Sequence, residues 1–250
     1  MLSKRLVKII KSLQIKKFRQ REQLFFVEGE KVLVELLGSD YQITDLFMTQ
    51  EFENSHPGLI TGDFERHLVS EKELVELGTF KSNNAGLAIV KMPESISQDL
   101  KFQNHFTIAL DDVRDPGNLG TILRLADWYG VKDVICSSSC VDVYNPKVLS
   151  ATMGSFLRVN VHYVELEDVL KVCNVPIYAA LLDGESVHTF DFRKDGCVLL
   201  MGNESNGISP KLLTDVIPIT IPRFGKAESL NVALATGILC DRIRGAINLQ

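Results

Sequence analysis

The stretch that decides the fold of this chain runs from Leu199 to Arg244. It consists of LLMGNESNGIS (199–209), a short spacer, ITIPRFGKAESLNVALATGIL (219–239) and CDRIR (240–244). Both longer segments begin with an apolar run that is typical of a buried strand, and both continue into a polar loop that contains glycine or proline. The second loop leads into a helix that Ser229 or Asn231 can cap, and the free N–H groups at a helix N-terminus favour an anionic or polar ligand. By itself, the stretch is also explained by a well-capped C-terminal helix.

The length and composition indicate a soluble cytoplasmic protein. With 250 residues the chain can bury a sizeable core in one large or two small domains. Its longest apolar stretch, around Leu230 to Cys240, is too short and too polar to cross a bilayer. The five histidines are scattered without a carboxylate or cysteine at ligand spacing, so we expect no metal site. An odd number of cysteines without a C-x-x-C pair predicts buried thiols in a reducing cytosol, and these are Cys136, Cys140, Cys173, Cys197 and Cys240.

Charge is distributed unevenly along the chain. Residues 1–21 carry eight basic side chains and no acidic one, so the remaining residues hold 19 basic and 32 acidic side chains. A basic arm on an acidic body suggests a polyanionic partner such as a nucleic acid. The alternative is an amphipathic helix with a solvated basic face, because apolar residues such as Leu6 and Leu13 recur at helical spacing. The candidate contacts to a nucleic acid are Lys16, Lys17, Arg19 and Arg21.

The order of apolar and polar segments predicts an α/β protein with two domains. The first, residues 1–95, alternates short strands with helices, and Ser70 with Glu73 forms the capping-box pattern of a helix start. A polar linker at residues 96–104 separates it from residues 105–250. There, a strand from Phe106 to Leu110, a glycine-containing loop and a helix open a series of buried strands. This spacing predicts a mostly parallel sheet that is covered on both faces.

The helix predicted from about Leu119 to Tyr129 has one face that is not expected to pack on the core. At about 100° per residue, Thr121, Arg124 and Trp128 fall opposite the side that carries its apolar residues. The only tryptophan of the chain lies on this face, which suggests that something covers it, and a second subunit is the simplest candidate.

Common nucleotide and hydrolase motifs are missing from the sequence. The loop DPGNLG (115–120) lacks the G-x-G-x-x-G of a dinucleotide fold and the Gly-Lys-Ser/Thr of a phosphate loop, and no G-x-S-x-G elbow occurs. Taken alone, this loop is an ordinary turn before a helix. The loop around Glu204 lies between Gly202 and Gly207, where backbone can approach a ligand closely, but it is also explained as a turn.

Three loops in fixed order resemble the three successive motifs of the SpoU (TrmH-like) RNA ribose methyltransferases of the SPOUT class. They are LDDVRDPGNLGTILRLADWYGV (110–131), LLMGNESNGIS (199–209) and ITIPRFGKAESLNVALATGIL (219–239). The segment VYNPKVLSATMGSFLRVNV (143–161) is similar to that family as well, and FRQREQLFFVEGEKVLVELL (18–37) resembles the substrate-binding domain that many members carry. The sequence departs from the family pattern at Ser205 and at Arg223-Phe224.

The resemblance implies a C-terminal domain with a deep trefoil knot and an enzyme that transfers a methyl group from S-adenosylmethionine to a ribose 2′-hydroxyl. It further implies a homodimer with active sites drawn from both subunits, and an RNA substrate for which ribosomal RNA is favoured while transfer RNA stays open. The cofactor would lie against Met201, Gly202, Ile221 and Leu230. The catalytic residues implied are Asn118, Arg124, Glu204, Ser229 and Asn231.

Two other functions stay open at this point. The first is an RNA-binding or assembly protein that keeps the same fold without turnover. The second is a Rossmann-type oxidoreductase, which the missing dinucleotide fingerprint disfavours.

Overall fold

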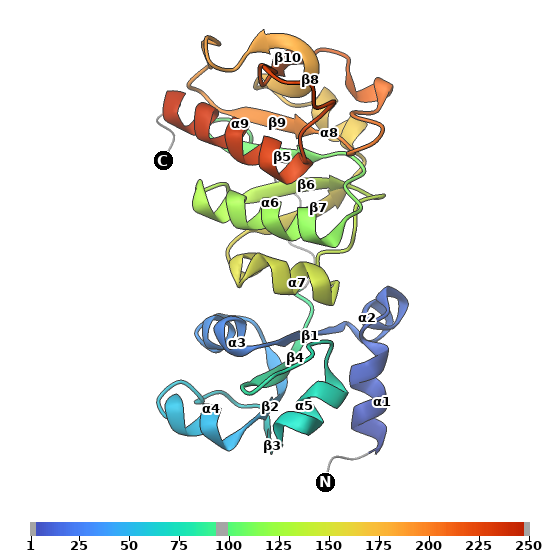
Figure 1. The fold of residues 1–250 in the computed structure, drawn as a ribbon, viewed down its shortest axis with the longest axis vertical. Helices are drawn as coiled ribbons and strands as arrows, with labels where there is room; N and C mark the ends of the chain where they lie inside the picture. The colour runs from blue at the N-terminus through green and yellow to red at the C-terminus, as the bar shows by residue number, and fades with distance from the viewer. Residues whose placement is uncertain (1–3, 94–99, 248–250) are drawn as a thin grey trace. The chain divides into compact units, whose positions relative to one another are not determined.

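The computed structural model describes residues 4–93 and 100–247, and its chain forms two compact units. The first unit comprises residues 1–97 together with 142–157, and the second comprises residues 98–141 together with 158–250. A short segment from the middle of the chain therefore belongs to the first unit, while the sequence on either side of it belongs to the second. In Figure 1 this segment contains the helix labelled α7 (Pro146–Thr152).

The first unit is built on a four-stranded mixed sheet in the order β1-β4-β2-β3. Strand β4 is antiparallel to both β1 and β2, whereas β2 and β3 are parallel. Its elements are α1 (Lys4–Ser12), α2 (Lys16–Glu22), β1 (Leu24–Glu28), α3 (Glu30–Leu37), β2 (Ile43–Met48), α4 (Gln50–Ser55), β3 (Glu65–Leu68), α5 (Glu71–Leu77), β4 (Gly86–Lys91), α7 (Pro146–Thr152) and the 3₁₀ turn η1 (Ser155–Leu157).

Alternate side chains of this sheet supply two separate apolar clusters. Phe25 of β1 packs on one face with residues of α3, α4 and α7, and its neighbour Phe26 packs on the other face with residues of α1 and α5. The predicted capping box at α5 is confirmed, because the Ser70 and Glu73 side chains bond each other's backbone N–H groups. The basic arm forms two helices, α1 and α2, and not one, and its apolar side packs on the core, where Ile10 and Leu13 are fully buried.

A buried ion pair holds the inserted segment to the N-terminal helices. Arg19 of α2 is only 1% exposed, and its Nη2 lies 2.5 Å from Oδ2 of Asp142, the first residue of the segment. Its Nη1 donates to the Leu13 carbonyl oxygen at 2.8 Å. The prediction that Arg19 binds RNA is therefore corrected: its guanidinium is occupied and out of reach of a phosphate. Removing one partner of such a buried pair typically costs about 3–5 kcal/mol, because the other charge is left uncompensated.

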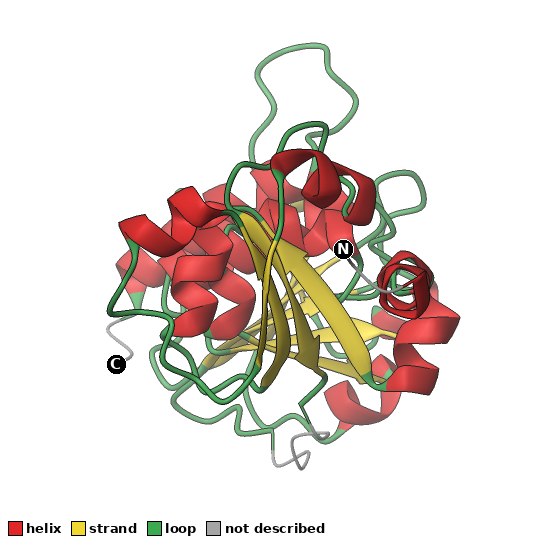
Figure 2. Ribbon diagram, turned by 90° about the horizontal axis from the view of Figure 1, so that it is seen from below, coloured by secondary structure: helices red, strands yellow, loops and turns green. Residues whose placement is uncertain are grey.

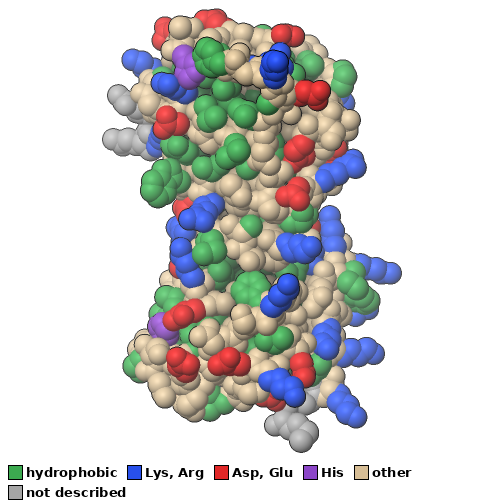
Figure 3. Space-filling model, viewed as in Figure 1, with side chains coloured by type: hydrophobic (Ala, Val, Ile, Leu, Met, Phe, Trp, Pro, Cys, Tyr) green, Lys and Arg blue, Asp and Glu red, His purple; other side chains and the backbone are tan. Residues whose placement is uncertain are grey.

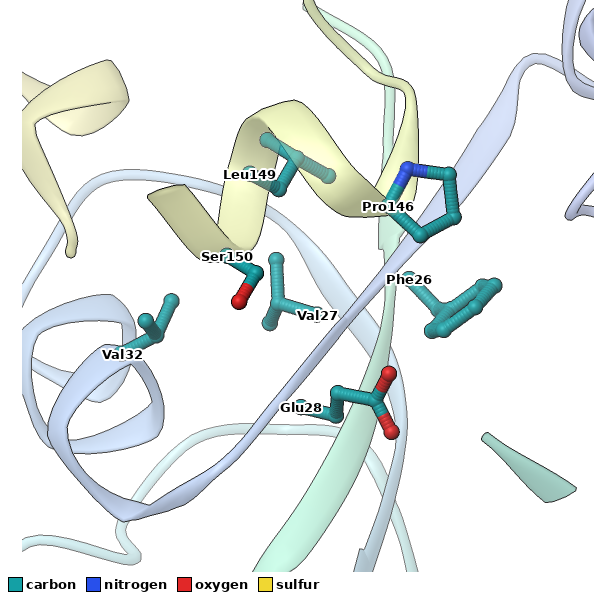
Figure 4. A pocket seen from close by; sticks show the side chains of 7 residues that line it. All are labelled: Phe26, Val27, Glu28, Val32, Pro146, Leu149 and Ser150. Atoms are coloured by element: carbon teal, nitrogen blue, oxygen red, sulfur yellow. The ribbon is translucent and has the colours of Figure 1, made fainter. Parts of the chain in front are cut away.

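A small cavity lies between β1 and α7 in the first unit (Figure 4). The Glu28 carboxylate beside it accepts hydrogen bonds from the backbone N–H groups of Thr79 and Phe80 and from the Thr79 hydroxyl. These donors compensate the buried charge, so we assign no ligand to this cavity. Its lining residues are Phe26, Val27, Glu28, Val32, Pro146, Leu149 and Ser150.

The second unit is built on a six-stranded sheet in the order β10-β8-β9-β5-β6-β7, and all of its strand pairs are parallel. This confirms the predicted parallel sheet; the trefoil knot stays a prediction. The elements are β5 (Phe106–Leu110), α6 (Pro116–Trp128), β6 (Asp133–Ser137), β7 (Asn160–Val164), α8 (Leu166–Lys171), β8 (Ile177–Ser186), β9 (Cys197–Met201), the 3₁₀ turn η2 (Pro210–Leu212), β10 (Ile217–Thr220) and α9 (Val232–Ala246).

Helices cover both faces of the large sheet (Figures 1 and 2). On one face, Ala109, Ile135 and Leu200 pack with Leu166 and Leu170 of α8. On the other face, α6 and α9 lie side by side and contact each other. Strands β5 and β9 are neighbours near the middle of the sheet, so the loops that follow them leave the same edge together. That edge is where open parallel sheets bind their ligands.

None of the helices in the described ranges is both long and apolar enough to span a membrane.

Candidate active site

Helix α6 begins earlier than the sequence pattern predicts. It spans Pro116–Trp128 rather than starting near Leu119, because the Asp115 side chain accepts a hydrogen bond from the Asn118 backbone N–H at 2.9 Å. Proline is favoured in a first turn, where its missing N–H has no helical partner to lose. The DPGN segment is therefore a capped helix start and not a free turn. This places the Asn118 side chain on a rigid element.

Asn118 joins two other loops through its side-chain amide. Its Nδ2 donates to Oε1 of Glu204 at 2.5 Å, and its Oδ1 accepts from Nδ2 of Asn231 at 2.9 Å. These partners lie 86 and 113 residues away along the chain. Three of the five catalytic candidates therefore meet at one point, at the carboxyl-end edge of the parallel sheet.

The loop after β9 is closed by its own backbone and fastened to the loop after β5. Asn203 and Gly207 exchange backbone hydrogen bonds, and a Cβ on Gly202 would lie 2.3 Å from the Gly207 carbonyl carbon. Only glycine therefore fits at position 202. Asn203 Nδ2 donates to the Asp112 carbonyl oxygen at 2.8 Å, and Asp111 Oδ2 accepts from the Ser209 N–H at 2.7 Å.

Sequence reasoning did not single out Asp111, Asp112 or Asn203 as positioning residues. A partial signal was present, because Asn203 is an Asx-turn residue whose Oδ1 accepts from the backbone N–H groups of Ser205 and Asn206. The other contacts form between two loops that are far apart in the sequence, so no local sequence pattern predicts them.

The cap of α9 is Asn231, not Ser229. The Asn231 Oδ1 accepts from the N–H groups of Ala233 at 2.9 Å and Leu234 at 3.3 Å. Its Nδ2 remains free to reach Asn118, so one side chain both starts the helix and holds the site. Ser229 lies two residues earlier on an exposed part of the loop.

Arg124 does not join the Asn118 cluster within one chain. It lies six residues along α6 from Asn118, which is about 9 Å along the axis and about 120° around it. It is exposed together with Thr121 and Trp128, as predicted. Across the described ranges its guanidinium has no hydrogen bond or ion pair. The cation therefore faces outward and is available to a ligand or a second subunit.

A buried thiol and a surface ion pair beside the loop that follows β5 have shifted pKa values. Cys140 accepts a hydrogen bond from the Val113 N–H at 3.3 Å, and the hydrogen bond with the Cys136 thiol is the main reason that its pKa is lowered to about 7. The same pairing, with burial, raises the pKa of Cys136. All five cysteines are free, and all except Cys173 are buried. At the surface, Asp112 accepts from Arg114 Nε at 2.7 Å and raises the pKa of that guanidinium.

The residues expected to hold S-adenosylmethionine combine an apolar lining with unused backbone groups. Met201 is buried at the end of β9, while Gly202, Ile221 and Leu230 are partly or fully accessible in the two loops. The backbone groups of residues 221–226 make no hydrogen bond to another described backbone group. Free N–H and C=O groups beside apolar side chains suit an adenosyl group, which needs both. In the described ranges no group of three His, Cys, Asp or Glu side chains is placed to hold a metal ion.

The chain matches two family models that together cover most of its length. Residues 105–241 match the SpoU rRNA methylase family, and residues 4–88 match the MRM3-like substrate binding domain. A curated relative, the 23S rRNA (guanosine(2553)-2′-O)-methyltransferase RlmP of Bacillus subtilis, is 30% identical over 244 residues, which is 96% of each chain.

Solved structures of similar proteins cover nearly the whole chain as well. A putative RNA methyltransferase of the TrmH family from Porphyromonas gingivalis is 34% identical with a TM-score of 0.87, covering 98% of this chain and 99% of the other. An AdoMet-bound rRNA methyltransferase from Sinorhizobium meliloti is 30% identical with a TM-score of 0.88, covering 98% and 96%.

The fold and the three joined loops define an RNA methyltransferase that uses S-adenosylmethionine. More specifically, the chain belongs to the SpoU rRNA methylase family. The predicted family, α/β SPOUT fold, enzyme class and cofactor are confirmed.

Replacing the cap residue tests the double role of Asn231. Asn231→Ala should lower the free energy of unfolding by about 1 kcal/mol, because two N–H groups of α9 lose their acceptor. Urea denaturation measures this difference. The matched Ser229→Ala variant should stay within about 0.5 kcal/mol of the parent, as surface substitutions usually do. Equal losses in the two variants would contradict the assignment of the cap.

Proposed function

We propose that this protein methylates a ribose 2′-hydroxyl of ribosomal RNA in the cytoplasm. The observation that carries the proposal is the junction of Asn118 with Glu204 and Asn231, because it assembles the three family motifs into one site. The Bacillus subtilis relative, whose name specifies 2′-O-methylation of 23S rRNA, supports ribosomal over transfer RNA. Free, mostly buried thiols suit the reducing cytoplasm.

The difficulty of the reaction is that a ribose hydroxyl is very weakly acidic. Bound S-adenosylmethionine supplies the methyl group, so the chain must orient the hydroxyl and stabilise the negative charge that develops on its oxygen. Arg124 carries a guanidinium that is not deprotonated in proteins, so we assign it electrostatic stabilisation and phosphate binding rather than the role of a base.

Glu204, Asn118 and Asn231 position the reactants. Glu204 uses Oε1 to accept from Asn118, and in the described ranges Oε2 has no partner, so this oxygen is left to accept a hydrogen bond from a ligand. The Ser229 hydroxyl lies exposed in the same loop as Asn231 and offers a further contact to RNA. Met201, Gly202, Ile221 and Leu230 would hold the cofactor.

Incubation with methyl-labelled S-adenosylmethionine and total RNA from a strain lacking the protein tests the activity. Label should enter ribosomal RNA and appear in alkali-resistant dinucleotides, because a methylated 2′-oxygen cannot assist cleavage. Arg124→Ala should lower turnover about 10²- to 10³-fold, the usual loss for one electrostatic donor. Arg124→Lys should also be impaired, because an ammonium lacks the planar fork.

Arg193→Lys is the matched control, because within the described residues the guanidinium of this exposed arginine pairs only with nearby Asp195, and turnover should not change. Cofactor and RNA binding without incorporation would favour the alternative of a non-catalytic RNA-binding protein. Incorporation into transfer RNA alone would contradict the proposed substrate.

The first unit is proposed to hold the RNA through its exposed basic helices. Figure 3 shows Lys and Arg side chains gathered over α1 and α2. Lys16, Lys17 and Arg21 are exposed there, and the match to a substrate binding domain spans this region. Arg19 is left out of this set because its guanidinium is buried against Asp142.

Neutralising these three cations should flatten the salt dependence of RNA binding. The slope of log affinity against log salt should fall by about 2 in a Lys16→Gln, Lys17→Gln, Arg21→Gln variant, since each lost phosphate contact removes about 0.7 on single strands. Fluorescence anisotropy at several salt concentrations measures it. Lys171→Gln should leave the slope unchanged, and Arg19→Gln should lower stability instead. An unchanged slope in the triple variant would refute the role of this surface.

A homodimer is proposed through α6 and α9. These helices contact each other, and each exposes apolar side chains. Trp128 of α6 is 82% exposed, and Leu234 and Ile238, which lie one turn apart on α9, are 63% and 38% exposed. Apolar faces of this kind are typically covered in an oligomer. Arg124 shares the face with Trp128 and is directed away from Asn118 of its own chain. In the dimer, Arg124 of one subunit would therefore lie beside the Asn118 cluster of the other subunit.

Sedimentation at micromolar concentration should therefore give twice the chain mass. Trp128→Glu should produce monomers, because a charge at the centre of an apolar interface is not compensated. The matched control is Val172→Glu, since Val172 is similarly exposed at 78% but follows α8. A monomeric parent protein would remove the proposal.

A further inference from the structure

The loop between β10 and α9 exposes an aromatic ring that the folded chain does not use. Phe224 is 94% exposed, more than any other large hydrophobic side chain in the described ranges. Every residue from 223 to 231 is exposed. Burying a phenylalanine ring is favourable relative to leaving it in water. An unburied ring on a functional loop therefore indicates a ligand that covers it.

Two cations flank this ring. Arg223 precedes Phe224 directly and Lys226 follows two positions later, and both are exposed without an acidic partner in the described ranges. Arg223 Nη1 donates only to the Ala227 carbonyl oxygen, at 3.3 Å, which folds the loop back on itself. A Cβ built on Gly225 meets no atom within 4 Å outside its chain neighbours, so the space beside the backbone at this position is open.

The loop leads directly into the candidate active site. Asn231, which contacts Asn118, lies seven positions after Phe224. A fully extended chain of that length reaches at most about 25 Å, so a ligand bound at Asn118 lies within reach of the ring. One strand of RNA can therefore contact both points.

An aromatic ring between two cations matches the chemistry of an unpaired nucleotide. Single-stranded RNA is bound by stacking bases on aromatic rings while basic side chains hold the backbone phosphates. A base inside a duplex is already stacked and offers no free face. We propose that Phe224 stacks on an unpaired base near the methylated ribose, with Arg223 and Lys226 on the adjacent phosphates. The substrate would then present its target in a single-stranded loop or end; this inference rests on the proposed RNA methylation.

Binding of short RNAs separates this inference from the methylation itself. The probes are a fluorescein-labelled 12-nucleotide single-stranded RNA of mixed sequence and the same strand in a duplex. The parent protein should prefer the single strand. Phe224→Ala should weaken single-strand binding about 5- to 150-fold, the loss expected for one stacked base, and abolish the preference. Phe224→Tyr should bind like the parent, because it keeps the ring.

Leu182→Ala is the matched control, since Leu182 is also a largely exposed apolar residue of the second unit. It should leave both RNA affinities unchanged. With total ribosomal RNA as methyl acceptor, Phe224→Ala should raise KM by a similar factor at nearly constant kcat. Methylation by the parent together with unchanged RNA binding in Phe224→Ala would overturn the inference and leave the proposed function intact. A single-strand preference that is lost in Phe224→Ala, without any methylation by the parent, would support the inference and contradict the proposed function.

Two further measurements identify other occupants of the ring. Calorimetry should give the same S-adenosylmethionine affinity for Phe224→Ala and the parent, and sedimentation the same mass. A loss of cofactor affinity would show that the ring covers the cofactor, and a loss of mass would show that a second copy covers it; either result would overturn the inference. Tryptophan fluorescence gives a direct test of stacking in the Phe224→Trp variant. If the single strand quenches this variant more strongly than it quenches the parent, whose tryptophan is Trp128, the result would support stacking.

Discussion

The candidate site depends on a chain of amide hydrogen bonds whose direction is fixed by a helix. The first N–H groups of α9 need an acceptor, so Asn231 turns its Oδ1 toward them and its Nδ2 toward Asn118. Asn118 must then present Oδ1 to Asn231 and Nδ2 to Glu204, which as a carboxylate only accepts. The orientation of each amide, meaning which atom donates and which accepts, is therefore set by the preceding group in the series. An aspartate at position 118 would lack the donor and repel Glu204, so the arrangement requires asparagine.

The basic side chains of the N-terminal helices serve two different purposes. Arg19 is dehydrated and bonded to Asp142, a residue that joins the first unit from far along the chain. Lys16 and Lys17 of the same helix remain in water. The difference arises from helical periodicity, because Arg19 lies on the face toward the core. A charge run can therefore contain both buried structural members and exposed members, here the ones proposed to bind RNA, and their burial distinguishes them.

Local signals made most of the fold predictable from the sequence. Buried strands, the parallel sheet and the Ser70 capping box depend on residues close together in the chain, and these predictions are confirmed. The start of α6 was placed too late because the capping role of Asp115 was not recognised. The Arg19 pair could not be foreseen, since its partner lies 123 residues away. For the same reason, the contacts of Asn203 and Asp111 that join the two loops could not be foreseen, since they exist only once the loops meet.

The two exposed apolar surfaces of the second unit differ in ways that assign them different partners. Trp128, Leu234 and Ile238 lie on rigid helices that contact each other, and a preformed apolar face of that kind suits an equally rigid protein surface. Phe224 lies between cations on a loop whose backbone groups are largely unbonded, which suits a polyanion with planar bases. Asn231 connects the two, because it begins helix α9 and ends the loop. In the proposed dimer, one side chain thus couples subunit contact, catalytic geometry and RNA recognition.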